Sequence, residues 1–152
     1  MEEEIKKLIS ELKEAATDVY SQLGNGWKEE IYQKAMEVAL RERGISYETQ
    51  RMLPITYADH VIGDAIPDLV VWIKDNGKKM AIVIDLKWEP GIKDEHRYQV
   101  QKYIQELKKQ VHKNEEVYNT GFVINFVKES TSQKLKDGFE ELGGVQVLEV
   151  KV

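Results

Sequence analysis

Two aspartates and a lysine lie on either side of a short turn near the middle of the chain. Asp68 begins one apolar stretch, and Asp85 and Lys87 end the next one. Asn76-Gly77 stands between the two stretches, and an Asn-Gly pair flanked by apolar runs is a strong signal for a two-residue β-hairpin. With this turn, Asp68 and Asp85 pair directly across the two strands, with Cβ atoms about 5 Å apart. Lys87 projects from the same face as Asp85, because side chains alternate along a strand.

This predicted cluster of two carboxylates and one amine is an arrangement that folding alone disfavours. Like charges directly opposite each other destabilise a sheet, and buried carboxylates are costly unless something compensates them. A divalent cation would compensate them, since Mg²⁺ binds one or two carboxylates together with waters and substrate phosphate oxygens. A lysine beside the ion can orient or deprotonate an attacking water. Alternatively, both aspartates lie at solvated strand ends and Lys87 neutralises one of them, or a one-residue bulge breaks the pairing.

The segments around this hairpin predict a mixed α/β domain. The two hairpin strands are apolar on both faces, which is typical of central strands covered by helices on each side. Apolar residues at three- and four-residue steps predict helices at 3–23, at about 27–43 and from 94 to about 113. Strands are expected at 47–55, 57–62, 68–74, 79–88, 120–127 and 145–152, and a further short helix at 132–142.

Composition places the chain among ordinary globular proteins. It has 152 residues, 41% of them hydrophobic and 32% charged, which suits one domain. No apolar run approaches the roughly 20 residues of a membrane span, and the acidic start MEEEIKK lacks the apolar segment of a signal peptide. There is no cysteine, which excludes disulfides and thiolate zinc sites. A cytoplasmic protein without membrane association is expected.

The distribution of charge bears on nucleic-acid binding. The formal net charge of −5 argues against a protein that coats nucleic acid through bulk charge. Residues 87–113, however, hold seven bases against four acids. This segment is either a local basic surface or a solvated helix face.

Four motifs, in order along the chain, resemble one family of nucleases. Pro67-Asp68 followed by Asp85-Leu86-Lys87 resembles the PD-(D/E)XK motif. Three further segments make the resemblance more specific. They are Gly26 to Tyr32, which fits the signature of the GxxExxY family, Gln99 to Tyr103, which fits the QxxxY motif of RecB-type proteins, and Gly121 to Phe126, which is similar to the late strand of that family. Together they cover roughly residues 19–127.

The resemblance implies a restriction-endonuclease-like α/β fold, with a central mixed sheet flanked by helices on both faces, and a metal site. Residues 1–24 would form an N-terminal helix, 25–127 the core, and 128–152 a C-terminal helix and strand of the same domain. Asp68 and Asp85, with the carbonyl of Leu86, would bind Mg²⁺ or Mn²⁺. Glu29 would be an additional ligand of the metal or of its water. Asp85 stands where the family more usually has glutamate, and its shorter side chain would shift the ion.

The resemblance also implies roles for three residues near the metal. Lys87 would be the catalytic lysine, and Gln99 and Tyr103 would position Lys87 or a substrate phosphate. The spacing of four places Gln99 and Tyr103 on one helix face, which His96 joins. His96 is interpreted as structural or solvent-facing, and Tyr32 and Tyr103 as packing residues with a polar tip.

The function expected from these motifs is Mg²⁺- or Mn²⁺-dependent hydrolysis of phosphodiester bonds, in DNA rather than RNA. A homodimer would supply the two sites needed to cut both strands of a duplex. Two alternatives remain: a non-catalytic nucleic-acid-binding protein on the same fold, and a regulatory subunit that acts through protein contacts. The mark of the second would be a large exposed apolar patch.

Overall fold

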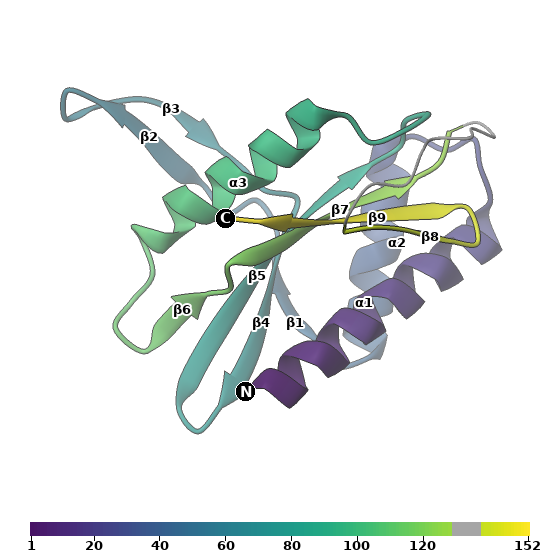
Figure 1. Cartoon of the computed structure of the whole chain (residues 1–152), viewed down its shortest axis with the longest axis horizontal. Coiled ribbons are helices and arrows are strands. Elements are labelled where there is room, and N and C mark those ends of the chain that lie inside the picture. The colour runs from purple at the N-terminus through teal and green to yellow at the C-terminus, as the bar shows by residue number, and fades with distance from the viewer. Residues whose placement is uncertain (129–137) are drawn as a thin grey trace.

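The computed structural model describes residues 1–128 and 138–152 and has a mixed α/β architecture, with helices on both faces of a central sheet (Figure 1). Two helices, α1 (Glu2–Leu23) and α2 (Glu29–Glu42), cover one face, and α3 (Asp94–Lys108) covers the other. The expected fold class, a central mixed sheet flanked on both sides, is confirmed. No helix in the described part of the chain is long and apolar enough to cross a membrane.

The main sheet is built around one long central strand, β5. Across the sheet, the order of strands is β1 (Ser46–Glu48), β4 (Leu69–Asp75), β5 (Lys78–Lys87), β7 (Thr120–Phe126), β9 (Val145–Lys151) and β8 (Phe139–Leu142). The β5–β7 pair is parallel and the other neighbours in this order are antiparallel. A short strand, β6 (Glu115–Val117), pairs in parallel with the first part of β5. Strand β5 is therefore paired along its whole length and lies in the interior.

The register of the β4–β5 hairpin agrees with the sequence prediction. Asn76 and Gly77 both have positive φ, 51° and 80°, as a two-residue type I′ turn requires. Pairing runs without a bulge from Asp75 opposite Lys78 to Leu69 opposite Ile84. Asp68 directly precedes Leu69, the first residue of β4, which pairs with Ile84. Asp68 therefore lies at the level of Asp85.

Two apolar clusters fix the helices on the sheet. Helix α1 contributes its apolar stripe to the first cluster, through Ile5, Leu8, Leu12, Ala15, Ala16 and Val19. Helix α3 packs through Val100, Tyr103, Ile104 and Leu107 on the opposite face. Gly121 of β7 sets how closely α3 approaches, because a Cβ there would lie 2.7 Å from Cγ1 of Val100 and 2.9 Å from the carbonyl oxygen of Val83.

The segment before the hairpin differs from the prediction of two strands at 47–55 and 57–62. It forms three: β1, β2 (Leu53–Tyr57) and β3 (His60–Ala65), and the last two make a separate two-stranded ribbon. Gln50 has φ of 57°, which interrupts the first predicted strand. Ala58 and Asp59, both with positive φ, form the turn of the ribbon. Neither Gln50 nor Ala58 is a residue type that predicts such a conformation.

Two predictions near the C-terminal half are wrong. The helix predicted at 132–142 is replaced over Phe139–Leu142 by β8, and residues 129–137 lie outside the described residues. The reason is the turn Gly143-Gly144, with φ of 53° and 90°, which folds β8 back onto β9. The helix predicted from 94 to about 113 ends at Lys108, and the short strand β6 was not foreseen.

Candidate active site

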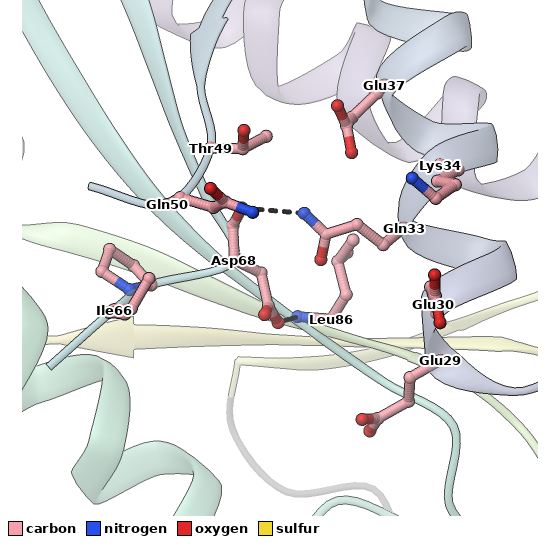
Figure 2. Close-up of a pocket in the computed structure, with 11 residues that line it drawn as sticks. Glu29, Glu30, Gln33, Lys34, Glu37, Thr49, Gln50, Ile66, Asp68 and Leu86 are labelled. Atoms are coloured by element: carbon pink, nitrogen blue, oxygen red, sulfur yellow. Dashed lines mark hydrogen bonds between the residues drawn. The ribbon is translucent and has the colours of Figure 1, made fainter. Parts of the chain in front are cut away.

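The open end of the β4–β5 hairpin holds the two aspartates. Strand β4 begins one residue after Asp68, so Leu86 has no β4 partner. The Asp68 side chain takes the partner's place, because its Oδ2 accepts a hydrogen bond of 2.7 Å from the Leu86 N–H (Figure 2). The N–H and C=O of a strand residue point to the same side, so the Leu86 carbonyl also faces this open end.

Asp85 is buried with only 2% of its surface exposed. The pKa of Asp85 is raised to about 8, first by burial and then by the neighbouring Asp68, and Lys87 opposes both effects. Oδ2 of Asp85 accepts no hydrogen bond from any described residue, and the Lys87 Nζ atom lies 3.4 Å from it. A buried carboxylate oxygen without a hydrogen bond is costly, so the site is strained in the absence of a cation.

The Lys87 side chain is the cation in direct contact with Asp85. Burial lowers the pKa of Lys87, but the charges of Asp85, Glu29 and Asp68 raise it, and the net result is a raised pKa. Lys87 is therefore a charged ammonium at neutral pH. It can donate protons in hydrogen bonds or stabilise negative charge, and it is poorly suited to accept a proton.

Glu29 reaches the site from the start of α2. Its Oε1 accepts a hydrogen bond of 3.2 Å from the Trp88 N–H, just after the end of β5. Glu29 also lines a groove of about 590 Å³ that lies between α2 and the residues that precede β4 (Figure 2). In the groove, Gln33 Nε2 donates a 2.9 Å hydrogen bond to the Asp68 carbonyl. The charged residues that line the groove are Glu29, Glu30, Glu37 and Asp68 on the acidic side and Lys34 on the basic side.

Helix α3 brings two further predicted residues to the same face of the sheet as Asp85. Tyr103 is buried, and burial together with the charges of Asp85 and Asp68 raises its pKa to about 12. The hydroxyl therefore stays protonated and can act as a donor. Gln99 lies one turn earlier on α3 and is half-buried.

Tyr32, the last residue of the Gly26–Tyr32 motif, is a packing residue. It is fully buried and stacks on Phe126 with ring centroids 4.6 Å apart. Its hydroxyl donates a 2.5 Å hydrogen bond to the Gly24 carbonyl. Tyr32 thus fixes the loop between α1 and α2, and this loop leads into Glu29.

The sequence analysis missed several polar residues around the end of β5. Gln33 is an ordinary polar position of α2 and gave no signal. Asn125 did give one, since it is the single amide inside the apolar strand β7. The buried residues Asn125, Gln146 and His96 form a network with the partly exposed Glu89, two residues beyond Lys87.

The residues present fit a divalent cation held by few protein ligands. Asp85 offers an oxygen with no hydrogen bond, and the Leu86 carbonyl faces the same end as the carboxylate of Asp68. Within residues 1–128 and 138–152, no group of three or more histidine, aspartate or glutamate side chains is close enough to hold a metal. Two carboxylates and a carbonyl leave most positions open, which suits Mg²⁺, an ion that usually keeps several waters.

Comparison with known families agrees with this geometry. The family model described as the PD-(D/E)XK nuclease superfamily matches residues 6–137, and the chain belongs to this superfamily. Membership indicates a nuclease that acts on nucleic acid, and nucleases of the superfamily generally depend on divalent metal ions. No curated protein matches the chain, and no solved structure does.

Proposed function

We propose that this protein is a Mg²⁺- or Mn²⁺-dependent deoxyribonuclease of the GxxExxY, RecB-like branch, with its active site at the open end of β4 and β5. One observation carries the proposal. Asp85 is a buried carboxylate with an oxygen that has no hydrogen bond, beside a second carboxylate and 3.4 Å from the ammonium of Lys87. Folding alone disfavours such a cluster, whereas a metal and a phosphate require it.

Asp68, Asp85 and the Leu86 carbonyl would hold the ion, with Glu29 binding one of its waters or the ion itself. When bound, the ion supplies a polarised phosphate and a more acidic water. The two carboxylates would only bind the ion, and the positive charge of the ion would compensate the charge of the buried Asp85. The acidic groove fits this arrangement, because its negative charge favours a cation before the anionic substrate enters.

Lys87 would act on the substrate phosphate as a charged donor. Its raised pKa keeps the ammonium protonated at neutral pH, so it stabilises the charge that grows on the phosphate oxygens and orients the attacking water. Tyr103 and Gln99, from α3, would position Lys87 or the phosphate. The raised pKa of Tyr103 is consistent with a hydroxyl that donates a hydrogen bond.

A cleavage assay tests this proposal. End-labelled single-stranded DNA, duplex DNA and RNA of one sequence are incubated with Mg²⁺, with Mn²⁺ or with EDTA. We expect cleavage of DNA in the two metal samples and none in EDTA. The Lys87→Met protein controls for contaminating nucleases. Equal cleavage by the variant, or no cleavage of any substrate by a folded wild type, contradicts the proposal.

One observation favours the alternative of a regulatory, partner-binding protein. The β2–β3 ribbon exposes three large apolar side chains, Tyr57, Val61 and Ile62, with 74%, 66% and 67% of their surfaces accessible. Exposed apolar patches mark interaction sites. The same assay separates the two functions, since a regulatory protein without nuclease activity leaves every substrate intact whatever metal is added.

A further inference from the structure

Buried polar side chains in the described residues occur at two places only, and the two places adjoin. The first place is Asp85. The second place holds His96, Asn125 and Gln146, which all belong to one network around Glu89, two residues beyond Lys87. Burying a polar group costs free energy unless it is hydrogen-bonded, and satisfied buried networks hold one defined geometry.

Asn125 and the main chain after β7 together continue the contacts past the end of β5, since the Lys128 N–H also donates a 3.1 Å hydrogen bond to the Glu89 carbonyl. Lys87 is the last residue of β5 to pair with β7, and its partner is Asn125. The Asn125 side chain then continues the pairing past that end: Oδ1 accepts a 2.9 Å hydrogen bond from the Glu89 N–H, and Nδ2 donates one of 2.9 Å to the Glu89 carbonyl. Nδ2 also donates a 3.1 Å bond to Oε1 of Gln146 on β9. Both polar atoms of the amide therefore have hydrogen-bond partners.

The Glu89 side chain is held by His96, at the start of α3. His96 Nδ1 accepts a 3.1 Å hydrogen bond from the Lys93 N–H, so the proton of the neutral ring is on Nε2. Nε2 lies 2.6 Å from Glu89 Oε2, a close polar contact without hydrogen-bond geometry, because this buried oxygen has no hydrogen-bond partner among the described residues. Both ring nitrogens are occupied, and neither is free for a substrate. The pKa of His96 is lowered by burial, the charge of Glu89 opposes this effect, and the charge of Lys87 lowers the pKa further.

Side chains from three separate parts of the chain therefore hold the main chain on either side of Lys87. Asp68 holds the Leu86 N–H, Glu29 holds the Trp88 N–H, and Asn125 holds both polar groups of Glu89. We propose that Asn125 and the Glu89–His96 pair are positioning residues that fix the end of β5 and thereby hold the Lys87 ammonium against Asp85. The inference deepens the proposed function and rests on it for the effect on catalysis.

Substitutions at His96 separate its two contacts. Glutamine places an amide N–H where Nε2 lies, so His96→Gln keeps the donor to Glu89. Asparagine places an oxygen where Nδ1 lies, so His96→Asn keeps the bond from the Lys93 N–H and loses the link to Glu89. Gln101→Leu is the matched control, because it removes another α3 contact, the 3.2 Å bond from Nε2 to the Lys151 carbonyl, far from the end of β5. Asn125→Ala tests the main-chain clamp.

The first readout is steady-state kinetics with DNA. Loss of a residue that orients a metal-site group typically lowers activity by about 10- to 100-fold. We expect such a fall in kcat for His96→Asn and Asn125→Ala, with KM and the dissociation constant for Mn²⁺ changed less than about threefold. His96→Gln and Gln101→Leu should keep kcat within about threefold of wild type. An unchanged kcat in folded His96→Asn overturns the inference, as does an equal loss in His96→Gln.

The second readout needs no nuclease activity. In NMR spectra of the metal-free protein with ¹³C-labelled lysine, a fixed side chain gives two distinct ε-proton shifts, whereas rapid rotamer exchange averages them. Lys87→Met assigns the signal. We expect two shifts for Lys87 in wild type, His96→Gln and Gln101→Leu, and one averaged shift in His96→Asn. Two shifts in His96→Asn overturn the positioning role even if the wild type cleaves no DNA, and averaging in a wild type without activity rejects both proposals. Should Asn125→Ala fail to fold, His96→Asn still decides.

Discussion

The hairpin of β4 and β5 has a charged pair at each of its two ends. At the turn, Asp75 lies opposite Lys78, and its carboxylate is also 3.6 Å from the amino group of Met1. At the open end, Asp68 lies at the level of Asp85, which is buried. Opposite charges across a strand pair stabilise it and like charges destabilise it. One pair of strands thus follows the rule for stability at its turn and breaks it at its open end, and we attribute the difference to function.

The largest effect should come from Lys87→Met at the open end. In the proposed mechanism the amine acts on the reacting phosphate and water, so we expect cleavage to fall by about 10²- to 10³-fold. Metal binding should remain measurable, because the carboxylates are intact. Cleavage of labelled DNA and isothermal titration with Mn²⁺ measure the two quantities. Wild-type turnover in the variant would remove Lys87 from the mechanism.

Metal should stabilise the wild type through the same two aspartates. At a hundredfold excess over its dissociation constant, an ion that binds only the folded state adds about 2.7 kcal/mol to the free energy of unfolding. Asp85→Asn should gain much less. Urea unfolding of both proteins, with EDTA and with Mg²⁺ or Mn²⁺, measures the difference. An equal gain in the two proteins would place the ion elsewhere.

Without metal, pH should affect the open end in a defined direction. The pKa of Asp85 is raised to about 8 in the folded state, above an unfolded value of about 3.9. The stability linked to this group is therefore complete below about pH 4 and is lost as pH rises toward 8. In EDTA at pH 7–8, Asp85→Asn should be more stable than the wild type by roughly 1–3 kcal/mol, and less so at pH 4. A destabilised Asp85→Asn protein in EDTA would show that the pair is not strained.

Glu29→Gln and Gln99→Ala should each lower cleavage by about tenfold or somewhat more without unfolding the protein. Glu29 is tied to the Trp88 N–H beside Lys87, and Gln99 lies one turn from Tyr103 on the face that α3 turns to the sheet. Circular dichroism melts check folding, and the DNA assay checks activity. If Gln99→Ala cleaves DNA at the wild-type rate, Gln99 has no role, and Tyr103 is the α3 residue that remains in the proposed site.

The smallest effect should come from the turn end. Asp75→Asn removes one charge from a partly exposed pair, so we expect a change in unfolding free energy within about 0.5 kcal/mol. Cleavage and metal stabilisation should match the wild type. This variant is the control for Asp85→Asn, since both remove one aspartate charge from the same hairpin. A loss of activity in Asp75→Asn would mean that any weakening of the hairpin impairs the site.

The sequence allowed the hairpin and its open end to be predicted because the information is local. Asn76-Gly77 sets the turn, and the two-residue period of a strand then sets which side chains face each other. The Glu89–Asn125 contact could not be predicted, since it joins residues 36 positions apart that only the sheet order brings together. The β2–β3 turn and the end of the first predicted strand depend on positive φ at Ala58 and Gln50, which residue type does not reveal.

The close approach of α3 to Gly121 limits which amino acids can replace this glycine. Any amino-acid replacement of this glycine adds a side chain, and alanine adds the smallest one. Even that methyl group would meet Val100 at 2.7 Å and the Val83 carbonyl at 2.9 Å. The strand cannot yield easily, because it is paired on both sides. The helix would have to move, and Tyr103 would move away from Asp85 with it. Position 121 should therefore tolerate almost no amino-acid replacement in a library selected for activity, although the proposed mechanism gives Gly121 no role.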